Sequence, residues 1–211
     1  MPSKLYKDLK LWYKPNRNSI GVTHSQIPSG LTGNGVFTGG VDSNDLAQLS
    51  GTTCPSLRLQ STRDTWVIDN LNTDGIITDK EFTFYIDFDV VSSSDNQIFR
   101  LKNSSNSNII TIGILTSSDR YRIFSNAGSA TWIPSSPNTF SGYVKMIIKY
   151  DGAKLILFIN GQEVGENAEN FTDVIDKISL DTAAERVVEI NEIAIWNFPK
   201  TDAECLELTR V

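Results

Sequence analysis

The chain has little cysteine, a single histidine and no long hydrophobic run. Its 211 residues include two cysteines and one histidine, His24. One histidine excludes a zinc site built from several histidines, and no nucleophile-elbow sequence accompanies His24 to complete a serine triad. No stretch of 18 consecutive apolar residues is present, so we expect no membrane insertion.

A net positive charge and phosphate-binding glycine loops are also lacking, although Lys4, Lys7, Lys10, Lys14 and Arg17 make the N-terminus locally basic, which we interpret as a solvated arm or edge strand. The formal net charge is −6, which argues against nucleic acid as a partner because a nucleic-acid footprint needs clustered Lys and Arg. No apolar segment follows Met1, so we expect no signal peptide and folding in a cytosol. In that compartment Cys54 and Cys205 are expected to be reduced thiols. The alternative is a disulfide between an early loop and the C-terminal helix.

What the sequence does contain is alternation of period two, which is typical of half-buried strands. The clearest example is residues 81–91, and residues 143–150 and 187–196 follow the same pattern. Asp151-Gly152 and Asn160-Gly161 flank an apolar run at residues 153–159, and both pairs readily form hairpin turns. These segments predict consecutive antiparallel strands.

The rest of the chain is organised around turns. Residues 18–56 are rich in Gly, Ser, Thr and Asn and predict a long irregular loop, and the polar residues 103–107 predict a hairpin tip. Thr201 and Glu204 form a capping-box pattern at the start of one short helix. Many short strands with one helix predict an all-β, two-sheet antiparallel sandwich, with residues 1–211 in a single domain.

Two segments carry a resemblance to a known family. The pattern Tyr-Asp-Gly-x-Lys-Leu-x-Leu-Phe-x-Asn-Gly at residues 150–161 resembles the laminin-G hairpin. Residues 189–204 are similar to the closing strand and capped helix of concanavalin A-like jelly rolls. The resemblance implies a jelly-roll sandwich, and its family includes glycan-binding modules, virion surface proteins and some glycosidases.

Glycosidases of this fold carry a Glu-x-Asp-x-x-Glu pattern on one strand. The nearest segment here begins at Glu189 but has Asn191 and Ala194 where the pattern needs acids. Asp87 and Asp89 form a second acidic segment that is equally incomplete, and we expect them to lie on a solvated strand face. The sequence therefore predicts that the protein is not an enzyme.

The segment 120–132 holds the residues best suited to bind a glycan. Trp132 lies in a predicted loop where its ring could stack on a sugar, and Tyr121, Arg122 and Asn126 precede it as further contacts. The alternative is that Trp132 folds back over a sheet edge.

The family's loop rim often holds calcium, which Asp95 with Asn96, or Asp119 with Asn126, could bind. Ordinary turn-forming roles explain these residues equally well. We therefore expect no cofactor.

A partner interface is expected on the strand at residues 153–159. Ile156 and Phe158 alternate with the core-facing positions, and Ile147 is expected beside them on the paired strand. Two large exposed apolar side chains forgo about 1.5–3 kcal/mol each, so a cover is expected. Either the 18–56 segment or another subunit could supply it.

Two functions remain open at this point. The first is a non-catalytic structural or surface protein of a bacteriophage, a decoration or fibre component of the virion. Such a protein would be assembled in the host cytoplasm with other virion proteins or as a homo-oligomer. The alternative is a lectin-like module that binds a cell-surface or polysaccharide glycan. The first rests on the family resemblance, which is weak support for a function.

Overall fold

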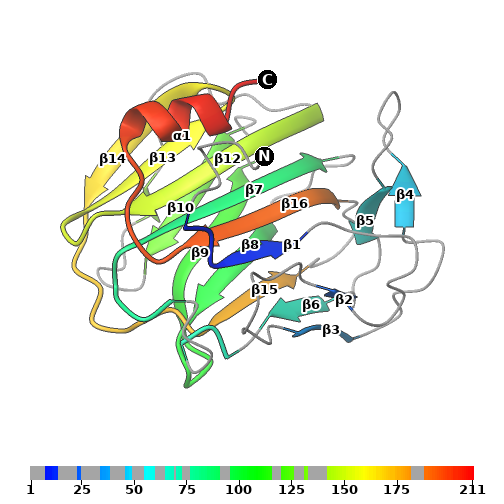
Figure 1. Cartoon of the computed structure of the whole chain (residues 1–211), viewed down its shortest axis with the longest axis horizontal. Coiled ribbons are helices and arrows are strands. Elements are labelled where there is room, and N and C mark those ends of the chain that lie inside the picture. Colours follow the sequence, from blue (N-terminus) through cyan, green and yellow to red (C-terminus); the bar gives the residue numbers. More distant parts are fainter. Residues whose placement is uncertain are drawn as a thin grey trace.

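The computed structural model describes residues 8–13, 23–24, 34–38, 46–48, 55–59, 65–68, 70–72, 77–90, 96–115, 120–125, 131–132, 142–181 and 188–211. These residues form two antiparallel sheets packed face to face, with one short helix near the C-terminus (Figure 1). The expected all-β jelly-roll sandwich is confirmed.

The first sheet has the order β14-β13-β12-β7-β16-β5-β4. Its strands are β14 (Gln162–Ala168), β13 (Lys154–Ile159), β12 (Gly142–Tyr150), β7 (Phe82–Val90), β16 (Val188–Trp196), β5 (Pro55–Leu59) and β4 (Leu46–Gln48). A further strand, β1 (Leu11–Tyr13), pairs with β16 at residues 193–195. The central pair is β7 and β12, which are registered along their full lengths.

The second sheet has the order β11-β10-β9-β8-β15-β6-β3-β2. Its strands are β11 (Thr131–Trp132), β10 (Arg120–Ser125), β9 (Asn108–Leu115), β8 (Asn96–Lys102), β15 (Lys177–Asp181), β6 (Thr65–Ile68), β3 (Asn34–Thr38) and β2 (Thr23–His24). Three of the short strands, β2, β3 and β4, fall within residues 18–56, so that segment is not wholly an irregular loop.

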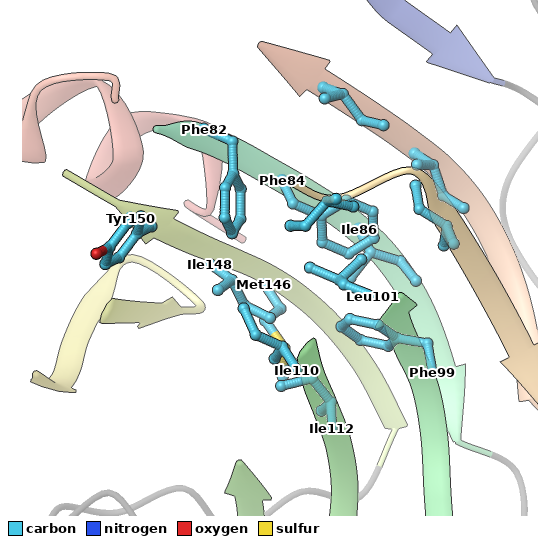
Figure 2. Packing of buried hydrophobic residues seen from close by; sticks show 14 of the residues in the cluster. Phe82, Phe84, Ile86, Phe99, Leu101, Ile110, Ile112, Met146, Ile148 and Tyr150 are labelled. Carbon is cyan, nitrogen blue, oxygen red and sulfur yellow. The ribbon is translucent and has the colours of Figure 1, made fainter. Parts of the chain in front are cut away.

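The core fills the space between the sheets. Alternate residues of β7 and β12 point inward and meet apolar side chains of β8 and β9 (Figure 2). The rings of Phe84 and Phe99 lie 5.1 Å apart between centroids and so join the two sheets. Burial of the inward face explains why alternation identified these strands.

The hairpin turns follow from residues that tolerate positive φ. Asn160 and Gly161 have φ values of 47° and 78°, as a two-residue turn with a right-handed strand twist requires. At the other end of β13, the Asp151 carboxylate accepts hydrogen bonds from the amides of Ala153 and Lys154 at 3.0 and 2.8 Å. Both predicted turns are confirmed.

The helix α1 (Asp202–Leu208) begins with the predicted capping box. The Thr201 hydroxyl accepts from the Glu204 amide, and the Glu204 carboxylate accepts from the Thr201 amide. The linker before the helix is tied to β7 through Thr83, whose hydroxyl donates to the Phe198 carbonyl and accepts from the Lys200 amide. An ion pair between Lys149 and Asp202 adds a second tie.

The helix covers the outer face of the first sheet, and this corrects the expected partner interface. Ile147, Ile156 and Phe158 are 0%, 6% and 0% exposed, in a cluster that includes Cys205 and Leu208 of α1. The helix lies across the β12–β14 side of the sheet in Figure 1. The chain's own helix therefore covers these side chains.

Cys205, on the sheet-facing side of α1, is a buried free thiol, and burial raises its pKa to about 12. Cys54 lies outside the described residues. Among the described residues, no helix has the length and apolar character needed to cross a membrane.

Candidate functional site

A pocket of about 100 Å³ opens at one end of the sandwich, which we call the end pocket. One wall is the β8–β9 hairpin, and the other is the segment between β14 and β15. Its lining residues are Asn103, Ser107, Asn108, Ile109, Phe171, Thr172 and Asp173. The antiparallel pairing of β8 with β15 brings these walls together, since Lys102 is registered opposite Lys177.

Backbone hydrogen bonds fix the hairpin wall. The amide of Asn103 donates to the Ser107 carbonyl at 2.9 Å, and the Asn103 carbonyl accepts from Asn106 at 3.0 Å. Asn106 has a φ of 65°, a conformation that Asn tolerates better than most residues. The Asn103 side-chain oxygen also accepts from the Ser107 amide at 2.8 Å. The hairpin tip is therefore internally ordered.

Asn103 links the two walls. Its side-chain nitrogen donates to Asp173 Oδ2 at 3.0 Å, across 70 residues of sequence. The amide of Asp176 donates to the Lys102 carbonyl at 2.8 Å just below the pocket. These two contacts hold the opposite walls at a fixed separation.

The floor of the pocket is apolar. Phe171 and Ile109 are 3% and 5% exposed. The Phe171 ring meets the ring of Tyr150 edge to face, with centroids 4.6 Å apart. The Tyr150 hydroxyl in turn donates to the carbonyl of Gly152 or Glu169, at 2.9 and 3.2 Å. The Phe171 ring is therefore held in position by its contact with Tyr150, which is itself hydrogen-bonded.

Several polar groups around the floor have no hydrogen-bond partner among the described residues. They are the hydroxyls of Ser107 and Thr172, the side-chain amide of Asn108 and the Oδ1 atom of Asp173. Together they offer both hydrogen-bond donors and hydrogen-bond acceptors to a ligand. Ser107, Thr172 and Asp173 are exposed and Asn108 is half-buried, so these groups form a solvated rim above the apolar floor. Apolar surface with a few polar groups is the usual lining of a small-molecule site, but the volume of about 100 Å³ is below the roughly 300–1,000 Å³ of most such sites, so only part of a sugar fits inside.

The predicted glycan residues lie elsewhere in the second sheet. Tyr121 and Arg122 are on β10, and Trp132 is on the neighbouring strand β11, registered opposite Ile123. Asn126 lies outside the described residues. The pairing of β10 with β11 brings the positions of these three residues onto adjacent strands at one end of the sheet.

Sequence reasoning did not find the end pocket, although it predicted the hairpin tip. The available signal was the polar run at residues 103–107 and the isolated aromatic Phe171 between polar residues. The missing information was that β8 and β15 are neighbours.

The two acidic segments meet across β7 and β16. Asp87 is registered opposite Glu192, and a bulge separates Glu192 from Ile190. Asp87 is 5% exposed and accepts hydrogen bonds from the Tyr143 hydroxyl at 2.5 Å and from the side-chain nitrogen of Asn191 at 3.0 Å. The expectation of a solvated Asp87 is therefore wrong, because these neighbours enclose the carboxylate and supply its donors.

No group of three or more His, Cys, Asp or Glu suited to a metal ion occurs in the described part of the chain. Of the proposed calcium residues, Asn96 is the first residue of β8. Asp95, Asp119 and Asn126 lie outside the described residues.

No family model and no curated protein sequence matches the chain. Solved structures with a similar fold include the binding domain of botulinum neurotoxin DC in complex with SialylT. That structure has a TM-score of 0.72 and 14% identity, over 98% of this chain and 52% of the other. A structure of botulinum neurotoxin type C, whose cell entry depends on interaction with two ganglioside molecules, has a TM-score of 0.73 and 13% identity, over 99% and 52%.

A third similar structure is Trypanosoma rangeli sialidase in complex with sialic acid, with a TM-score of 0.69 and 8% identity, over 95% of this chain and 32% of the other. The chain thus spans about half the length of the neurotoxin chains and about a third of the sialidase. At these identities the likeness identifies the fold, an antiparallel β-sandwich, and leaves the ligand to be argued from the residues of this chain.

Proposed function

We propose that this protein is a non-catalytic carbohydrate-binding module whose ligand occupies the end pocket. The observation that carries the proposal is the set of unengaged hydroxyl, amide and carboxylate groups around the buried Phe171. Sugars present hydroxyl groups beside apolar C–H faces. They therefore match a pocket whose rim is polar and whose floor is apolar. The fixed walls reduce the ordering required on binding.

The similar solved structures support the same class of ligand. They include a complex with SialylT, a protein that interacts with gangliosides and a complex with sialic acid. A structural role in a bacteriophage particle, the first expectation from the sequence, has no counterpart among the three structures named above. Glycan binding is therefore the better supported of the two functions, and a place in a virion remains a prediction.

The positions on β10 and β11 form a second proposed contact region. Tyr121, Arg122 and Trp132 lie on adjacent strands, and Asn126 is in the segment that connects them. In this proposal Trp132 stacks on a sugar ring and Arg122 donates to its hydroxyls. Substituting Trp132 by Ala tests this region separately from the end pocket.

The test of the main proposal begins with a glycan array, followed by calorimetric titration of the best ligand. Ser107→Ala and Asn108→Ala each remove a polar group from the pocket. One lost hydrogen bond is worth about 0.5–1.5 kcal/mol, so each variant should bind roughly 2- to 12-fold more weakly.

Ser104→Ala is the matched control, because Ser104 lies in the same hairpin tip but does not line the pocket. It should bind as the unaltered protein does. Equal affinity in all four proteins would place the ligand elsewhere, and no binding on the array would remove the proposed function.

A further inference from the structure

The charge of the end pocket is of one sign. Asp173 is the only ionisable residue among those that line it, and no Lys or Arg is among them. An aspartate carboxylate carries a negative charge at neutral pH. The hydrogen bond from Asn103 engages Asp173 Oδ2, which leaves Oδ1 available as an acceptor.

The segment between β14 and β15 that carries Asp173 is acidic. It contains Glu169, Asp173 and Asp176 and no basic residue, and in the preceding β14 Glu166 is paired with Lys154 at 2.6 Å. The opposite wall, residues 103–109, has no charged side chain. Lys102 and Lys177 follow next along the two walls but do not line the pocket, so the charge inside the pocket is that of Asp173, in a protein whose formal charge is −6.

We infer that the end pocket selects neutral sugars and discriminates against sialylated or otherwise anionic glycans. This inference rests on the proposed function, because it names the class of glycan for the same pocket. A sugar hydroxyl can donate to the Asp173 carboxylate, whereas the carboxylate group of a sialylated glycan has no hydrogen to donate there and carries the same charge.

The size of the discrimination follows from the charges. Two like unit charges 4 Å apart in bulk water weaken binding about fivefold, and the effect grows where the pocket walls exclude water. A Lys or Arg that binds the ligand carboxylate would offset this repulsion, and no Lys or Arg lines the pocket. We therefore expect a sialylated glycan to bind at least about fivefold more weakly than its neutral parent.

The experiment compares lactose with 3′-sialyllactose by calorimetric titration, on the unaltered chain and on Asp173→Asn. The asparagine oxygen can still accept the hydrogen bond from Asn103, so the walls should stay in place. Glu207→Gln is the control, since it removes the same charge from the exposed side of α1. Each titration is repeated from about 10 mM to about 1 M salt, which shortens the Debye length from about 30 Å to about 3 Å.

The expected result is a preference for lactose that narrows with added salt, disappears in Asp173→Asn and persists in Glu207→Gln. Equal or tighter binding of 3′-sialyllactose by the unaltered chain would overturn the inference while leaving glycan binding intact. A preference that Asp173→Asn does not reduce would also overturn it. If neither sugar nor any array glycan binds, the proposed function fails and the inference fails with it.

Discussion

Replacing Leu208 by Ala tests whether α1 stabilises the sandwich or merely rests on it. Leu208 is 6% exposed and packs in the cluster with Ile147, Phe158 and Trp196. Leu→Ala in an enclosed core removes about 2–5 kcal/mol. Because Leu208 is the last residue of a terminal helix, its surroundings can settle into the gap. We therefore expect the lower half of that range, about 2–3 kcal/mol.

Urea unfolding measures this change directly. The midpoint should fall while the slope of the transition stays constant, since the area exposed on unfolding is nearly the same. Glu207→Ala is the control, because Glu207 is the preceding residue and is exposed. Its effect should stay within about 0.5 kcal/mol. A loss below about 0.5 kcal/mol for Leu208→Ala, or equal losses for both variants, would refute the covering role of α1.

Three further predictions concern the same helix and the face beneath it. Phe158→Glu should lower thermal stability without changing the mass measured by light scattering, because α1 covers Phe158; a shift to a smaller species would instead reveal a subunit contact. At Glu204, burial alone would raise the pKa, but the amide and hydroxyl of Thr201 and the charge of Lys200 outweigh burial and lower it. The stabilisation that the Glu204 carboxylate contributes is complete above its ordinary pKa of 4.5 and is lost as the pH falls through the lower pKa of the folded protein. Glu204→Gln removes this titration, so the free energy of unfolding should depend less on pH on the acid side. A curve identical to that of the unaltered chain would contradict this. In a Cys54→Ser background, Cys205 should react with Ellman's reagent only on unfolding, since burial raises its pKa to about 12; rapid reaction in the folded protein would show that the helix opens readily.

Strands that bury one whole face could be predicted from the sequence, whereas an edge strand and a very short strand could not. Alternation identified β7 and β12 because every inward residue is apolar. It did not identify β14, an edge strand in which Val164 is the only buried side chain. It also did not identify β15, where five residues give too short a pattern.

The helix itself was predictable, but its position over the sheet was not. The capping box at Thr201 fixes where α1 begins. Its place over Ile156 and Phe158 depends on contacts distant in sequence, above all the hydrogen bonds of Thr83 to Phe198 and Lys200. A prediction made without those contacts assigns the outward residues of β13 to an external partner.

The end pocket depends in the same way on distant segments. Asn103 and Asp173 are 70 residues apart and meet only because β8 pairs with β15. No local pattern encodes that pairing, since register between distant strands is set by the whole sheet. The family resemblance predicted the fold correctly. The glycan contacts were predicted at Trp132, because it is a large ring in a predicted loop, and not at this pocket.

The most direct test of the account is amide chemical-shift mapping with the neutral oligosaccharide that binds best on the array. If the end pocket is the glycan site, the largest shifts should fall in residues 103–109 and 171–173, and Ser107→Ala should reduce the affinity measured from the same titration. Large shifts confined to β10 and β11, or no shifts at millimolar sugar, would contradict it.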